Sequence, residues 1–175
     1  MNVEQKDQHI VLAAAPCSHG IGYVVFKGPQ IIVEWGMRYV LKDKNRNALT
    51  KIKDLVEAHQ PDILVIEDYT GHRSRRAPRI RSLIRSIDRY AQEQAIEVHR
   101  FSRGDIRDCF QAFRARTKHQ IATKISTWWP EMKRLLPPKR TPWESERARM
   151  AAFDATALGV TYFDGASHSD EVATK

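Results

Sequence analysis

The sequence predicts one α/β domain with a mixed five-stranded sheet and helices on both faces. Three apolar segments with short connections fill the first third of the chain, which is typical of antiparallel strands. Two helical patterns, each followed by a short apolar segment, then predict strands that join the sheet in parallel through crossover helices. The chain of 175 residues is long enough for one domain with its own core.

The first three strands are expected at residues 9–15, 21–28 and 31–40. Their sequences are HIVLAAA, IGYVVFKG and IIVEWGMRYV, and Gly28-Pro29 marks the turn between the second and the third. Because both connections are short, these strands form an antiparallel meander.

Two crossover units follow the meander. The segment NALTKIKDLVEAHQ, residues 47–60, has apolar residues at helical spacing, and PDILVIEDY, residues 61–69, is apolar enough for a strand buried on both faces. A second helix is expected at residues 78–95, with its apolar side chains on one side. The fifth strand is expected in IEVHRFS, residues 96–102.

The last part of the chain is expected to be helical around one irregular loop. Residues 104–113 and 118–129 have helical patterns, whereas residues 130–143 contain four prolines and predict a basic loop. An alanine-rich helix is expected from Ser145 to Phe163.

These elements place one domain at residues 9–163, with a flexible N-terminus at 1–8 and a disordered polar tail at 164–175. No segment approaches the roughly 18 apolar residues of a membrane span, and the polar start lacks the features of a signal peptide. Cys17 and Cys109 show neither disulfide nor metal-ligand spacing and suit a reducing compartment. The sequence therefore predicts a cytoplasmic protein with no membrane partner.

The formal net charge of +8 is concentrated in one segment. Seven arginines and Asp88 give residues 70–90 a charge of +6. The arginines are Arg73, Arg75, Arg76, Arg79, Arg81, Arg85 and Arg89. Clustered arginine indicates binding to phosphate polyanions, because its planar fork suits phosphate oxygens. Nucleic acid is the predicted partner, and a solvated basic face is the alternative.

Glu67 lies near the carboxyl end of the predicted buried strand, where α/β sheets place ligands. An ionised carboxylate beside so apolar a segment is costly unless it meets a cation or a metal. An acid already in solvent at the strand end is the alternative. Asp68 alternates to the other face and is expected in solvent or as a cap.

Asp154 lies in the middle of the predicted last helix, on the side that it shares with Met150 and Leu158. It is too far from either helix end to act as a cap, so an acid on this packing side needs a partner. A neighbouring arginine is the alternative to a functional role.

Two carboxylates from separate elements, beside a phosphate-binding segment, predict a divalent-metal site that acts on a phosphodiester. Mg²⁺, or Mn²⁺, takes oxygen ligands, and a pair of ions can stabilise both the attacking and the leaving oxygen. Glu67 and Asp154 are the predicted metal ligands and catalytic residues. Lys118 is a third catalytic candidate that could neutralise developing charge, and His19 is a candidate metal or phosphate contact. A solvated lysine and a structural turn histidine are the alternatives.

Taken together, these segments resemble the RuvC-type Holliday junction resolvases of the ribonuclease H-like superfamily. VLAAAPCSHGIGYVVF is similar to the first hairpin of that family, ILVIEDY to the strand that carries its catalytic glutamate, and FDATALGVTYF to its last helix. RTKHQI is similar to the segment whose lysine approaches the scissile region. The hairpin positions that match are Pro16, Ser18, Gly22 and Tyr23.

The resemblance covers residues 9–163 and implies a ribonuclease H-like fold with Glu67, Asp154 and Lys118 in catalytic roles. It implies a metal-dependent, structure-selective endonuclease acting on branched DNA. It also implies a homodimer, because a junction has two strands to cut symmetrically.

Two of the four metal-binding positions of the family lack an acid here. Ala15 stands where the family has the aspartate that bridges two metals, and Ala151 stands at the position three residues before Asp154. An inactivating substitution at position 15 would give the same sequence. Candidate substitutes for the missing acids are Glu144, Glu146 and Asp68.

Three hypotheses therefore remain from the sequence. The first is the metal-dependent endonuclease. The second is a DNA- or RNA-binding module that keeps the fold and the basic face without nuclease activity. The third is a protein-interaction domain with an incidental basic surface.

Overall fold

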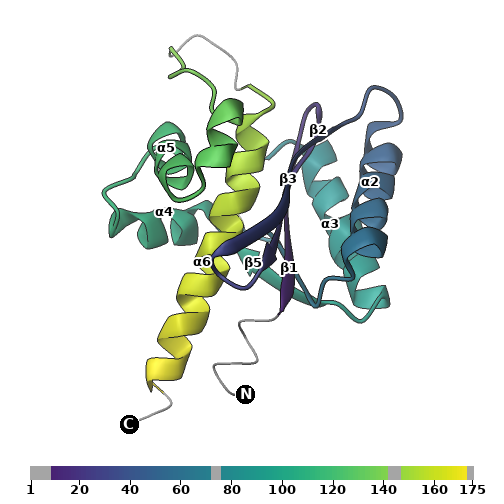
Figure 1. Cartoon of the computed structure of the whole chain (residues 1–175). Coiled ribbons are helices and arrows are strands. Elements are labelled where there is room, and N and C mark those ends of the chain that lie inside the picture. Colours follow the sequence, from purple (N-terminus) through teal and green to yellow (C-terminus); the bar gives the residue numbers. More distant parts are fainter. Residues whose placement is uncertain (1–8, 72–75, 142–146, 173–175) are drawn as a thin grey trace.

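The computed structural model describes residues 9–71, 76–141 and 147–172, with side chains described up to residue 165. A five-stranded sheet with the order β3-β2-β1-β4-β5 forms its centre (Figure 1). The strands are β1 (Ile10–Cys17), β2 (Gly20–Lys27), β3 (Ile31–Tyr39), β4 (Ile63–Glu67) and β5 (Glu97–Phe101).

The first three strands form an antiparallel meander, and the last two join the sheet in parallel. β1 pairs antiparallel with β2 and parallel with β4, and β5 pairs parallel with β4. The predicted mixed sheet is therefore confirmed. Because β1, β4 and β5 run in the same direction, their carboxyl ends meet at one edge of the sheet.

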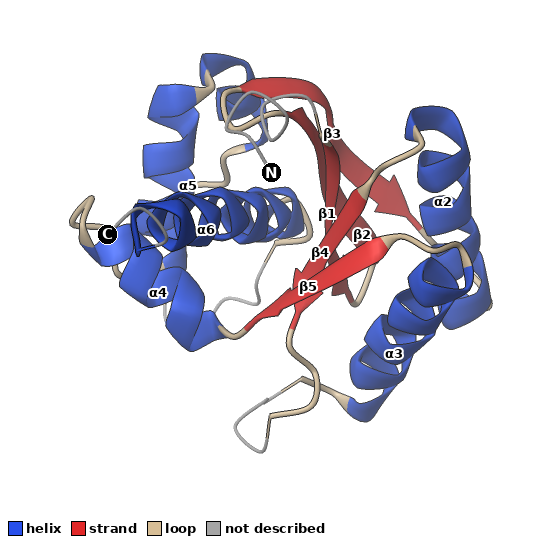
Figure 2. Cartoon of the chain, turned by 90° about the horizontal axis from the view of Figure 1, so that it is seen from below, coloured by secondary structure: helices blue, strands red, loops and turns tan. Residues whose placement is uncertain are grey.

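Helices cover both faces of the sheet, as predicted (Figure 2). α2 and α3 lie on one face, and α4, α5 and α6 lie on the other (Figures 1 and 2). The bounds are α2 (Lys44–His59), α3 (Pro78–Glu93), α4 (Arg103–Gln111), α5 (Lys118–Trp128) and α6 (Met150–Val172), with a 3₁₀ helix, η1 (Pro130–Leu135), inside the predicted loop. Among the described residues, no helix has the length and apolar character needed to cross a membrane.

Alternate residues of β1 enter two hydrophobic cores, because successive side chains of a strand point to opposite faces. Val11, Ala13 and Ala15 belong to the core that includes residues of α6. Leu12 and Ala14 belong to the core with α2 and α3. The odd-numbered side chains of β1, Ala15 included, therefore point to the face of the sheet that α6 covers.

Glycines allow α6 to lie directly against β1 and β2. A β-carbon at Gly22 would overlap the backbone of Ala151, and one at Gly159 would overlap the Phe26 ring. Phe26 packs edge-to-face with Trp129 and Phe163, with ring centroids 5.7 and 5.5 Å apart. The close approach fixes the position of α6 relative to the sheet.

The bounds predicted for the last helix were wrong at both ends. Residues 148–149 form a turn, and α6 begins at Met150 rather than at Ser145, which lies outside the described residues. At the other end, α6 continues past Phe163 to Val172, through most of the tail that was expected to be disordered. Residues 164–172 contain no proline, so an already formed helix is extended at little cost.

The close contact predicts that Gly22→Ala destabilises the protein. The added methyl group must displace the backbone of α6, which costs roughly 1–3 kcal/mol in a packed core. The matched control is Gly165→Ala in α6, where a β-carbon meets nothing within 4 Å. The control should be neutral or more stable by up to about 1 kcal/mol in urea unfolding. Equal free energies of unfolding for the two variants would contradict this packing.

Candidate functional site

A pocket of about 780 Å³ opens at the carboxyl edge of β1, β4 and β5, bordered by α4, α5 and α6. Glu67 is the last residue of β4, and Ala15 lies near the end of β1. Lys118 and Asp154 reach the pocket from α5 and α6. The structure therefore brings together the three predicted catalytic residues and the alanine at the family aspartate position.

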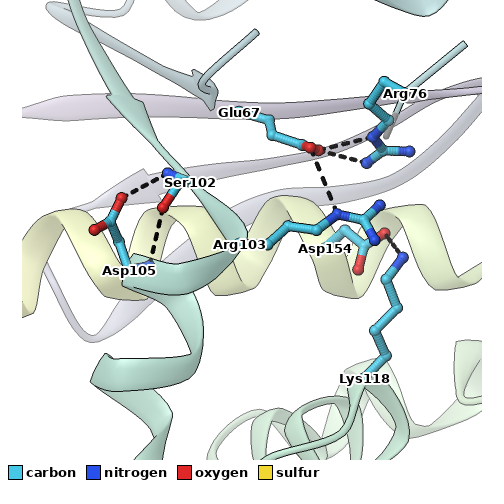
Figure 3. A network of polar contacts seen from close by, with 7 residues as sticks. All are labelled: Glu67, Arg76, Ser102, Arg103, Asp105, Lys118 and Asp154. Carbon is cyan, nitrogen blue, oxygen red and sulfur yellow. Dashed lines mark hydrogen bonds and ion pairs between the residues drawn. The ribbon is translucent and has the colours of Figure 1, made fainter. Parts of the chain in front are cut away.

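The Glu67 carboxylate is held by two arginines (Figure 3). Glu67 is only 7% exposed, which excludes the alternative of an acid already in solvent. Arg76 donates to Oε2 from Nε at 2.9 Å and from Nη2 at 2.6 Å. The Nε atom of Arg103 lies 3.5 Å from Oε1. The buried carboxylate thus meets cations supplied by the chain itself.

Asp154 is paired in a similar way. Lys118 Nζ donates to its Oδ2 at 2.9 Å, from the first residue of α5 to α6 (Figure 3). The two side chains are 33% and 20% exposed, so this pair lies nearer to solvent than Glu67. The predicted catalytic lysine and acid therefore contact each other.

The two alanines at family acid positions have different surroundings. Ala15 lines the pocket and is 2% exposed. Ala151 is 3% exposed, lies against Gly22, and is not among the described residues that line the pocket. Position 15 therefore faces the pocket, whereas position 151 is buried where the backbone of α6 meets β2.

The pocket residues do not fit a pair of divalent ions. Within residues 9–71, 76–141 and 147–165, no three His, Cys, Asp or Glu side chains gather closely enough to hold a metal ion. Of the three described carboxylates that line the pocket, Glu67 and Asp154 are each paired with a cation of the chain, and Asp68 accepts bonds from Thr70. A metal would have to displace these cations and would still find half of the family's acids missing.

The other candidate ligands lie elsewhere. His19 contacts Ser18 in the exposed β1–β2 turn, and neither residue is among those that line the pocket. Asp68 borders the pocket, where its Oδ1 accepts bonds from the Thr70 amide and hydroxyl, which hold the pKa of Asp68 below its usual range. Asp68 therefore caps its own loop. Glu144 and Glu146 lie outside the described residues.

The predicted arginine segment divides into several roles. Arg76 enters the pocket, whereas Arg79 donates to Asn45 Oδ1 at 3.0 Å. Arg81 and Arg85 contact Tyr69: the first donates to its carbonyl, and the second lies 5.9 Å from its ring centroid. The remaining members are Arg89, exposed and 3.9 Å from Glu93, and Arg73 and Arg75, which lie outside the described residues.

Additional cations border the pocket on the side of α4 and α5. They are Arg103, Arg107 and Arg116, none of which the sequence singled out. The sequence predicts the phosphate contacts in residues 70–90 instead. The four-residue spacing of Arg103 and Arg107, directly after a predicted strand, was the available sign that both lie on one side of a helix at the sheet edge.

A buried ionic network holds the loop that follows Glu67. Asp88 of α3 is 1% exposed and accepts bonds from Arg100 Nε and Nη2 at 2.7 and 2.6 Å, and from the Tyr69 hydroxyl at 3.0 Å. Burial raises the pKa of Asp88, but the bonds from Arg100, Gln92 and Tyr69 outweigh it and hold this pKa below its usual value. Tyr69, the neighbour of the pocket residue Asp68, is thereby tied to β5 and α3.

The network predicts a specific change in acid stability. Because the folded-state pKa of Asp88 is lowered, its stabilisation is present above the unfolded value near pH 4 and is lost as the pH falls further. Asp88→Asn should reduce the free energy of unfolding at pH 7 by about 1–3 kcal/mol. It should also flatten the loss of stability between about pH 5 and pH 3.

The control for this experiment is Asp54→Asn, which changes an exposed acid of α2. Its unfolding free energy at pH 7 should stay within about 0.5 kcal/mol of the wild type. A pH profile of Asp88→Asn that runs parallel to the wild-type profile would show that Asp88 is not held ionised by its partners.

Comparison with known proteins found similar folds but no close sequence relative. No family model matches the chain, and no curated protein matches it. The structure of RuvC from Thermus thermophilus aligns with a TM-score of 0.63 and 13% identity, covering 91% of this chain and 96% of RuvC. RuvC from the same organism in complex with a Holliday junction substrate aligns with a TM-score of 0.65 and 13% identity, covering 92% and 96%.

A third similar structure is the yeast mitochondrial Holliday junction resolvase. It aligns with a TM-score of 0.59 and 12% identity, covering 90% of this chain and 80% of the resolvase. Together with the strand order and the position of α6 across the sheet, these alignments show that the chain has the ribonuclease H-like fold of the RuvC-type Holliday junction resolvases.

Proposed function

We propose that this protein binds branched DNA through a positively charged surface around the pocket and does not cleave it by two-metal chemistry. The observation that carries the proposal is the pairing of Glu67 and Asp154 with cations of the chain, at a site whose border has an excess of positive charge.

Among the described residues, four arginines line the pocket: Arg76 from the segment before α3, and Arg103, Arg107 and Arg116 with α4 and α5. The proposed surface also includes Arg81 and Arg85 of α3, which do not line the pocket but contact Tyr69, the neighbour of the pocket residue Asp68. Basic groups around a hollow attract a phosphate backbone and gain affinity from counterion release. The preference for branched over duplex DNA is inferred from the fold shared with the two resolvases.

The ion pairs also oppose metal-dependent cleavage. Separating Arg76 from the buried Glu67 carboxylate removes two hydrogen bonds to one oxygen that compensate the cost of burying that charge. Without an acid at position 15, the ion that replaced the arginine would lack the bridging carboxylate that the family resemblance implies. Binding without hydrolysis requires neither change.

The alternative function is a metal-dependent endonuclease. It is favoured by the convergence of Glu67, Asp154 and Lys118 on one pocket, which a module retaining only the fold would not need. This function would use Mg²⁺ or Mn²⁺, and symmetric cleavage of a junction would call for a homodimer. An assay for cleavage separates the two functions.

Incubation with four-way junction, duplex and single-stranded DNA in Mg²⁺ or Mn²⁺ should show junction binding and no strand cleavage. Wild-type protein and Glu67→Gln should give the same uncut substrate on a denaturing gel. Ala15→Asp adds a carboxylate to the three described ones that line the pocket and tests whether that residue alone restores cleavage. Wild-type cleavage that Glu67→Gln abolishes would establish the endonuclease instead.

Charge reversal tests the binding surface. Arg85→Glu should weaken junction binding at least threefold at low salt and reduce the slope of log affinity against log salt by about 1. Lys27→Glu makes the same change of charge at the end of β2, where Lys27 pairs with Ile10, the first residue of β1. This position is at the opposite end of β1 from the pocket. The variant should bind nearly as the wild type does. Equal losses for both variants would point to overall charge rather than to this surface.

A further inference from the structure

We infer that the pocket binds one phosphodiester group of a nucleic-acid strand directly, with arginine and lysine side chains in the place of divalent ions. This inference rests on the proposed function and adds the chemical group bound at the centre of the surface. It follows from the charges of the lining residues, the positions of two helix ends and the small side chain at position 15.

The charges around the pocket leave an excess of positive charge for an anion. Arg76 neutralises Glu67, and Lys118 neutralises Asp154. The other charged residues that line the pocket are Arg103, Arg107, Arg116 and Asp68. They add +2 when Asp68 is subtracted from the three arginines, so an entering phosphodiester with one negative charge is attracted without removing either ion pair.

Arg76 and Arg103 differ in how tightly they hold Glu67. Arg76 is 17% exposed and makes two hydrogen bonds to one carboxylate oxygen, which suits a fixed counter-ion. Arg103 is 52% exposed, and its Nε lies 3.5 Å from the other oxygen, which is an ion pair longer than a hydrogen bond. Arg103 can therefore turn toward a phosphate while Arg76 keeps the buried carboxylate neutralised.

Two helices begin at the pocket. Ser102, Arg103 and Gly104 line it at the start of α4, and Arg116 and Lys118 line it at the start of α5. The positive ends of both helix dipoles therefore face the same space as the arginines. Both helix ends are capped by side chains, Ser102 with Asp105 and Thr117 with Gln120, so the charge that they offer an anion comes mainly from Arg103 and Lys118, the first residues of the helices.

The remaining lining residues are small or apolar. Ala15 leaves room beside Glu67, and Ile121, Phe153 and Leu158 form part of the wall. Apolar walls strengthen a charge-assisted contact because they lower the local dielectric. An aspartate at position 15 would both fill this space and repel a phosphate. The alanine that removes a metal ligand therefore favours an anion in the same pocket.

The first test uses thymidine dinucleotide, which carries a single phosphodiester, as the probe. Isothermal titration in EDTA at low salt should show saturable binding that added Mg²⁺ does not strengthen. Arg103→Ala should weaken this binding about tenfold, as expected for loss of a charge-assisted contact. Arg103→Lys should recover part of it. Lys27→Ala, at the opposite end of β1 from the pocket, is the matched control and should bind as the wild type does.

Ala15→Asp gives a second, opposite readout. In EDTA it should bind the dinucleotide more weakly than the wild type, and Mg²⁺ should restore binding because the added carboxylate then serves a cation. Thermal unfolding of each variant checks that the fold is kept, and Arg107→Ala repeats the test at an exposed residue of α4 if Arg103→Ala fails to fold.

The outcomes separate this inference from the proposed function. Wild-type binding that depends on Mg²⁺, or an Arg103→Ala variant that binds dinucleotide and junction as the wild type does, would overturn the phosphodiester site. In the second case, junction binding that Arg85→Glu weakens would leave the proposed function intact. Dinucleotide binding without junction binding would overturn the proposed function and retain the phosphate site.

Discussion

The buried charge of Glu67 is the constraint on which the arrangement of the site depends. A carboxylate that is 7% exposed at the end of an apolar strand must meet positive charge. In a metal-dependent nuclease an ion can supply that charge, whereas here Arg76 and Arg103 supply it. In this structure both Glu67 and Asp154 are paired with cations of the chain, and further arginines border the same pocket.

The fold was predictable because its elements follow simple periodicities. The apolar segments of β1 and β4 and the helical spacing of α3 predicted the order of strands and helices and hence the mixed sheet. The end of α6 was not predictable in the same way, because polar residues extend a helix whose first turns are held by packing. A polar composition is compatible both with a disordered tail and with the last turns of a helix, so it could not predict where α6 ends.

The two acids of the site could be predicted from the sequence, but the cations with which they pair could not. Glu67 and Asp154 stood out because each is an acid where an apolar residue would normally lie. Arg103 became visible only in three dimensions, since it begins α4 and its contact with Glu67, at the end of β4, depends on the direction of that helix. The same applies to Arg100, whose pairing with Asp88 joins a strand to a helix of the opposite layer. Sequence spacing reports which side of an element a residue occupies, and folding decides which sides meet.

The contact between Gly22 and the backbone of Ala151 has a consequence for the rigidity of the site. A helix that packs so closely on a strand has little freedom to slide or rotate. Asp154 lies one turn further along the same helix, and Glu67 ends a strand of the same sheet. The position of the two acids relative to each other is therefore set by the fold, whereas the charge between them is set by side chains alone.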